Sequence, residues 1–345
     1  DFDAEAEKLA DAGASRLFNV ENALQKCLVN YASELLANAP DRTDAIQQVQ
    51  ELYERLPVLP HSYRSQLKTS FNGQGQHFEP SPAVASVVLE LLSDKMKLGL
   101  GGDKSPLVYI TNSNGGYIEG MSPRAATVYT HANPDLVPSG IDSFNPALNR
   151  NLKIVADSVD SQNPESMDFV VANEDASSLA KTVSYDGVTY KRRDLLNAAK
   201  ALSVMKEDGG AVIMIKEDGS LDGRVDGEFK AFLEWMYSRF EIGGVAEING
   251  DVFKVDGETA NMRIISVDGK LLIPDLDAKP PEKFDILDTS AEVMALPKVW
   301  RVDALSQVDS TVESDDQPKQ NLSDLLKGAN SQFGQKVESN EYQTR

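Results

Sequence analysis

The sequence is poor in the residues that disulfides and most metal sites require. It has one cysteine, Cys27, among 345 residues, which excludes an internal disulfide and disfavours a cysteine-based metal site. Only three histidines are present, His61, His77 and His131, so a histidine-rich metal site is not expected either. The sequence therefore predicts that no metal is bound.

Long apolar runs are also missing. The longest, ASVVLELL and GGAVIMI, are far shorter than the roughly 20 residues that a membrane-spanning helix needs. No signal-peptide pattern opens the chain. We expect no membrane span.

Basic residues are scarce relative to acidic ones. The 34 Lys and Arg residues face 54 Asp and Glu residues, which gives a net charge of −20. Because proteins bind DNA phosphates through clustered Lys and Arg, strong intrinsic nucleic-acid binding is not expected. The tight basic cluster Lys191–Arg193, in YKRRD, is more typical of a helix start on a solvated surface than of a phosphate clamp.

The hydrophobic pattern divides the chain into three parts. Residues 1–62 predict an N-terminal helical arm, because apolar residues recur at helical spacing, as at Ile46, Val49 and Leu52. Residues 63–300 alternate apolar strands with amphipathic helices and predict an α/β domain. Residues 301–345 are polar and have too few apolar groups for a core, which indicates a linker or tail.

Within the middle part, the order of elements predicts the sheet. Strands are expected at PLVYI, ATVYT, LKIV, DFVVAN, GAVIMI, GVAEIN and NMRIISV, with helices over 82–93, 192–208 and 226–240. Strands that alternate with helices favour a mostly parallel sheet covered on both faces. The last two strands follow one another without a helix and predict an antiparallel hairpin at the edge of that sheet.

These segments resemble a known family. HFEPSPAVASVVLELL, VYITNSNGGYIEG, MDFVVANEDA and FKAFLEWM, followed by GGVAEINGDVFKVDGETANMRIISVDG, resemble in order and spacing the N6-adenine DNA methyltransferase domain. The likeness is greatest to the methyltransferase-like regions of large phage anti-restriction proteins, in which this domain precedes a helicase. It covers roughly residues 65–275 and implies a Rossmann-like methyltransferase fold.

In this family, a carboxylate and a glycine-rich turn after the first strand hold S-adenosylmethionine. The resemblance places Ile110 at the acid position and Asn114 at the first glycine, with Gly116 retained. His131 stands where the second strand carries the ribose-binding carboxylate, and Asp157 falls at the adenine-contacting position. An alkyl group cannot accept a hydrogen bond and an imidazole cannot accept two, so we expect no bound cofactor.

The catalytic loop of the family reads Asn-Pro-Pro-Phe or Asp-Pro-Pro-Tyr and holds the amino group of a flipped adenine. Here the corresponding residues are Asn173, Glu174, Asp175 and Ala176. Prolines and aromatic ring are missing, and two carboxylates stand where DNA phosphate would approach. We interpret this stretch as a catalytic loop that has lost its function, and as a loop it is expected to tolerate prolines at 174 and 175.

These departures predict a catalytically inactive methyltransferase-like protein that acts as a structural and interaction subunit. The resemblance implies a phage virion protein that enters the host cytoplasm with DNA and contacts other subunits through its N-terminal helices and C-terminal tail. The start at Asp1 fits maturation by a head protease and equally fits a partial chain. Two alternatives stay open: an active S-adenosylmethionine-dependent adenine methyltransferase with divergent motifs, and an acidic DNA mimic that occupies a basic restriction enzyme.

Overall fold

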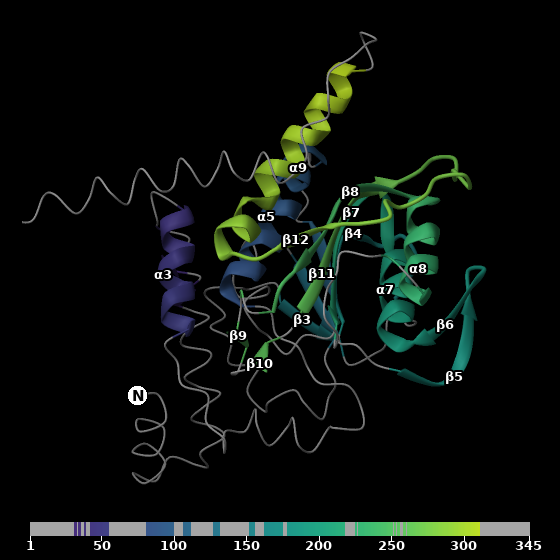
Figure 1. Cartoon of the computed structure of the whole chain (residues 1–345), viewed down its shortest axis with the longest axis horizontal. Coiled ribbons are helices and arrows are strands. Elements are labelled where there is room, and N and C mark those ends of the chain that lie inside the picture. The colour runs from purple at the N-terminus through teal and green to yellow at the C-terminus, as the bar shows by residue number, and fades with distance from the viewer. Residues whose placement is uncertain are drawn as a thin grey trace, which may run out of the picture.

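The structure is a computed structural model, shown in Figure 1. It describes residues 42–54, 81–99, 106–111, 127–131, 152–155, 162–174, 178–217, 227–250 and 261–310, with isolated positions within 31–38, at 225 and within 252–259. The predicted site positions Asn114, Gly116, Asp157, Asp175 and Ala176 lie outside these residues, as do residues 1–30 of the arm and the tail beyond 310.

One eight-stranded sheet organises the described residues, in the order β3-β2-β1-β4-β7-β11-β8-β12. The strands are β1 (Leu107–Ile110), β2 (Thr127–His131), β3 (Leu152–Val155), β4 (Met167–Glu174), β7 (Met205–Glu217), β8 (Phe240–Ile248), β11 (Asn261–Lys270) and β12 (Asp285–Leu287). Parallel pairing joins neighbours among β3, β2, β1, β4 and β7. Strand β11 runs antiparallel to both β7 and β8. Strands buried on both faces explain the continuous apolar runs in the sequence.

The predicted fold class is confirmed by this order and these directions. The chain moves outward from β1 to β3 and then returns to place β4 on the other side of β1, which is the strand reversal of a Rossmann-like fold. The predicted antiparallel hairpin is formed by β8 and β11. It lies at one end of the sheet, with only the short parallel strand β12 beyond it.

Helices cover both faces of the sheet. Alternate residues of a strand point to opposite faces, so Val108 and Ile110 of β1 join one core while Tyr109 joins the other. The first core contains apolar residues of α5 (Pro82–Gly99) and α9 (Ser290–Ser310). The second contains those of α7 (Arg193–Ser203) and α8 (Gly227–Tyr237), which Figure 1 shows side by side.

The described part of the predicted helical arm packs outside the sheet. Helix α3 (Arg42–Glu54) places Ala45, Ile46 and Val49 in the core shared with α5, and α5 lies between α3 and the sheet (Figure 1). Gln50 is buried, and its Oε1 accepts a hydrogen bond of 3.1 Å from the backbone N–H of Ala83. This bond satisfies one of the amide donors that the first turn of α5 leaves open. The described positions within 31–38 are helical as well.

A hairpin that the sequence analysis did not predict precedes α7. It consists of β5 (Ser178–Tyr185) and β6 (Val188–Arg192), joined by Asp186 and Gly187 at φ of 46° and 82°. Two positive φ values are what a tight hairpin turn needs, and an Asp-Gly pair supplies them. The Asp186 carboxylate accepts a hydrogen bond of 2.8 Å from Trp235 Nε1, which ties the turn to α8.

Two further boundaries differ from the prediction. Helix α7 ends at Ser203, and the residues from Met205 to Asp208 begin β7, where Met205 pairs with Met167. Helix α9 continues to Ser310, across the expected boundary at residue 300. Its Trp300 packs so closely on β8 that a Cβ at Gly244 would lie 2.3 Å from the indole, so this position requires glycine. Among the described residues, none of the helices has the length and apolar character to cross a membrane.

Candidate functional site at the carboxyl edge of the sheet

The carboxyl ends of β4, β1 and β2 lie next to one another in the sheet. Open α/β sheets bind ligands at this edge, where the strand order reverses. Four predicted site positions come to it: Ile110 ends β1, His131 ends β2, and Asn173 and Glu174 end β4. The edge is therefore the candidate functional site.

Ile110 occupies the end of β1 as a core residue. It is fully buried, pairs with Val171 of β4, and belongs to the apolar core under α5. Its side chain offers no acceptor to a ligand, in agreement with the chemistry read from the sequence.

Glu174 is part of β4, and its expected place in a loop is wrong. It pairs with Ile215 of β7 and is only 4% exposed. Its Oε1 accepts a hydrogen bond of 2.6 Å from the Thr111 hydroxyl, and its Oε2 accepts one of 3.1 Å from Asn197 Nδ2. Thr111 Oγ1 in turn accepts a bond of 3.0 Å from the backbone N–H of Asn173. The carboxylate thus joins the ends of β1 and β4 to α7.

This position also overturns the expected tolerance of proline at 174. Proline there would delete a buried carboxylate that two polar side chains use, and it would place a ring in an interior strand. Proline is confined to edge strands, strand starts and bulges because it donates no backbone hydrogen bond and its ring crowds the neighbouring strand. Glu174→Pro is therefore expected to destabilise the fold.

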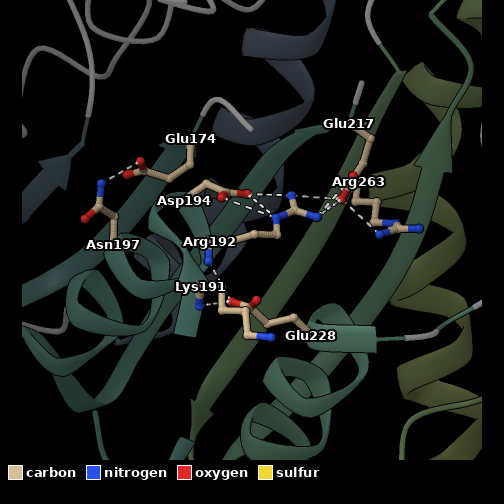
Figure 2. A network of polar contacts seen from close by, with 8 residues as sticks. All are labelled: Glu174, Lys191, Arg192, Asp194, Asn197, Glu217, Glu228 and Arg263. Carbon is tan, nitrogen blue, oxygen red and sulfur yellow. Dashed lines mark hydrogen bonds and ion pairs between the residues drawn. The ribbon is translucent and has the colours of Figure 1, made fainter. Parts of the chain in front are cut away.

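A second group of charged side chains extends from the start of α7 across β7 and β11 (Figure 2). The Arg192 guanidinium lies between the Asp194 carboxylate at 2.5 Å and the Glu217 carboxylate at 3.2 Å. Arg263 donates to the same Glu217 at 2.9 Å and to Glu247 of β8 at 2.7 Å. The result is an unbroken series of alternating charges from α7 to β8.

Burial makes this series sensitive to the loss of one member. The side chains of Asp194 and Glu247 are 0% exposed. Removing one partner of a buried ion pair costs about 3–5 kcal/mol because the other charge is left without compensation. Arg263 also lies 4.1 Å above the centre of the Phe229 ring, which adds a cation–π contact.

The electrostatics fix the charge of Arg192. Burial alone lowers the pKa of a guanidinium, but here the hydrogen bond to Asp194 and the charges of Asp194 and Glu217 outweigh it and raise the pKa of Arg192 above its usual value. This shift favours the cationic form of Arg192. The sequence analysis correctly predicted a helix start here, since α7 begins at Arg193, but Arg192 points into the network and its side chain is only 25% exposed.

Glu228 of α8 fastens the chain just before α7. Its Oε1 accepts hydrogen bonds of 2.8 Å from the backbone N–H groups of both Lys191 and Arg192 (Figure 2). A carboxylate that binds two neighbouring amides holds the end of β6 against α8. The start of α7 is thus fixed from two sides.

The charged side chains at this edge bind other groups of the protein itself. Figure 2 shows the Arg192 guanidinium between the carboxylates of Asp194 and Glu217, with Arg263 on the other side of Glu217. Among the residues that the structure describes, no group of three or more His, Cys, Asp or Glu side chains could hold a metal ion. Sequence reasoning missed five residues, because no local motif marks them and the sheet order and the packing of α7 bring them together: Thr111, Asn197, Glu217, Arg263 and Glu247.

Several solved structures are similar to this chain. No family model matches the chain, and no curated protein matches it. Among solved structures, it is similar to a protein from Listeria monocytogenes assigned as a class I S-adenosylmethionine-dependent methyltransferase, with 12% identity over 90% of this chain and 96% of that one, at a TM-score of 0.45.

Two restriction-modification proteins are also similar. One is the methyltransferase subunit of a type I system from Streptococcus thermophilus, with 13% identity over 87% of this chain and 73% of that one, at a TM-score of 0.39. The other is assigned as a modification subunit of a type I restriction enzyme from Vibrio vulnificus, with 10% identity over 81% of this chain and 60% of that one, at a TM-score of 0.39. The strand order, rather than these likenesses, defines the methyltransferase-like fold of the chain.

Replacing Glu174 tests its structural role. Glu174→Ala leaves the buried Thr111 hydroxyl and the Asn197 amide without their acceptor, so the free energy of unfolding is expected to fall by about 2–4 kcal/mol. The exposed Glu234 of α8 is a control, since Glu234→Ala should change stability by no more than about 0.5 kcal/mol. Urea unfolding measures both variants. Coincident curves for the two would contradict the assignment of Glu174 to the buried network.

Proposed function

We propose that this chain is a methyltransferase-like protein without methyl transfer, which acts as a structural and interaction subunit of a larger assembly. The observation that carries the proposal is the state of Glu174. It occupies the first proline position of the catalytic loop that the resemblance implies, yet it is buried at the end of β4 with both oxygens engaged by Thr111 and Asn197. A residue held in this way cannot also serve a flipped base, whose amino group needs a loop free to contact it.

Ile110 supports the absence of a cofactor. A ligand such as S-adenosylmethionine carries charged and polar groups that need acceptors, and the position at which the family supplies a carboxylate is here a buried alkyl group. The neighbouring Thr111 hydroxyl donates to Glu174 and accepts from the backbone N–H of Asn173, so it is already engaged within the protein. We propose that the protein works without S-adenosylmethionine.

The charge of the edge supports the absence of strong intrinsic DNA binding. The two arginines near the start of α7 and on β11 are held by three carboxylates, those of Asp194, Glu217 and Glu247. Phosphate binding depends on cationic groups that are free to replace counterions. The net charge of −20 adds long-range repulsion of DNA and attraction to basic protein surfaces.

The helical arm supports a role in assembly. Helix α3 buries one face on α5 and exposes Asp44, Gln47 and Glu51 on another. An added helix whose outer face is polar extends the surface that a globular domain offers to neighbours. We propose that the arm and the C-terminal tail contact other subunits.

A methyl-transfer assay tests the loss of catalysis. The full chain, mixed with radiolabelled S-adenosylmethionine and double-stranded DNA containing adenine in varied sequence contexts, is expected to incorporate no label above that of a heat-denatured sample. Transfer needs both substrates positioned together, and the sequence departs from the family at both sites, as at Ile110 and Glu174. A type I methyltransferase on its own recognition sequence serves as the positive control. Label recovered in N6-methyladenine would contradict the proposal and favour the active enzyme with divergent motifs.

The resemblance to phage anti-restriction proteins leads us to propose that the assembly is a virion and that the protein enters the host cytoplasm with the genome. Quantitative mass spectrometry of purified particles of the phage that encodes the chain is expected to find it at a fixed copy number per capsid. Its presence only in infected-cell lysate, and not in particles, would contradict a virion location without bearing on the loss of catalysis.

A further inference from the structure

The connection between β11 and β12 exposes three large aliphatic side chains. Leu272, Ile273 and Leu276 are 90%, 82% and 81% exposed. The other exposed large hydrophobic residues among those described, Tyr31 and Val183, are only 47% and 36% exposed. Contiguous exposed apolar patches on soluble proteins often mark sites of protein–protein interaction.

The backbone of this connection is held in shape. The N–H of Leu271 donates to the Arg239 carbonyl at 2.8 Å, and the N–H of Asp275 donates to the Ser238 carbonyl at 2.9 Å. The N–H of Asp277 closes a small turn by donating to Asp275 Oδ1 at 3.0 Å. Figure 1 shows the connection projecting past the end of α8. A segment fixed in this way loses little conformational entropy when its side chains enter a pocket.

The charges beside the apolar side chains are acidic. Asp275 and Asp277 are exposed and form no ion pair with any described residue. The nearby cations are already engaged: Lys270 binds Glu165 at 3.1 Å and Arg239 binds Asp186 at 2.9 Å. The exposed Lys279 and Lys283 lie further along, toward β12.

These charges indicate which kind of binding partner covers the three aliphatic side chains. A second copy of the chain would bring two acidic loops together, each on a molecule of net charge −20. A pocket with an apolar floor and a rim of Lys or Arg matches both the aliphatic side chains and the two aspartates. Charge complementarity of this kind raises association rates and fixes register.

We propose that residues 271–278 are a docking loop that inserts Leu272, Ile273 and Leu276 into an apolar pocket with a basic rim on a partner protein. The inference deepens the proposed interaction role and rests on it, but it does not depend on the loss of catalysis. It names a contact surface apart from the helical arm and the tail. The loop is the inserted element, and the pocket belongs to the partner.

Site-specific photo-crosslinking identifies the partner protein that binds the docking loop. The full chain carries a photoreactive phenylalanine analogue at position 273, or at position 183 as a control on an exposed aliphatic residue of β5. After irradiation in cells that produce the chain naturally, position 273 is expected to give one predominant adduct with a different protein that position 183 does not give. An adduct with a second copy, a crosslink within the chain, or no adduct would each overturn the proposal.

Binding of that purified partner then tests how the aliphatic and the acidic side chains of the loop contribute to the affinity. The triple variant L272S/I273S/L276S is expected to bind at least about tenfold more weakly, since buried aliphatic anchors dominate such contacts. D275N/D277N should weaken binding at low salt and approach the wild type at high salt, where surface charges are screened. Unchanged affinity of the triple variant would overturn the docking role.

The melting temperature separates docking from folding. Because the three side chains are exposed, the triple variant should melt within about 1 °C of the wild type. A fall of several degrees would mean that another segment of the chain covers the loop, and would overturn the proposal. The methyl-transfer assay is independent of these measurements, so failure of the docking loop and failure of the proposed loss of catalysis can be told apart.

Discussion

A carboxylate buried at the end of an interior strand requires hydrogen bonds to both of its oxygens, and the carboxyl edge of this sheet is arranged around that requirement. Glu174 receives them from Thr111, which ends the β1 segment, and from Asn197 of α7. The position of α7 places Asp194 and Arg192 beside Glu217. One buried acid therefore connects the ends of β1 and β4 to the helix whose start lies in the charged series.

The same requirement connects structure to function. The catalytic position that the resemblance implies is used here to hold three elements together, so stability and catalysis compete for it. Exchanging the loop for the residues of an active enzyme would remove the acceptor on which Thr111 and Asn197 depend. In the function that we propose, loss of activity and gain of a structural tie are two aspects of one substitution, and the arm and the docking loop are the surfaces that contact other subunits.

The sequence predicted the elements whose signal is local. Apolar runs such as VYI in β1 and AVIMI in β7 mark strands buried on both faces, and Leu195, Ala199 and Leu202 mark the buried face of α7. The hairpin β5–β6 has a local signal too, in Asp186–Gly187, which was overlooked. Met205 continues the helical spacing of α7 and was assigned to it, but pairing with Met167 in the sheet outweighs that spacing.

The site could not be predicted in the same way. Thr111 and Glu174 are separated by 63 residues, and Glu217 and Arg263 by 46. Nothing near either residue in sequence indicates its partner, because sheet order alone brings them together. Glu174 was placed in a loop because the resemblance implied one, whereas the strand pairing with Ile215 holds it inside β4.

Calorimetric titration of the full chain with S-adenosylmethionine tests the central claim most directly. At millimolar ligand we predict no saturable heat, because the buried alkyl side chain of Ile110 stands where the resemblance implies the carboxylate that holds the cofactor. Saturable binding of one molecule per chain with a dissociation constant in the micromolar range would contradict the claim, since it would show that the cofactor site has survived.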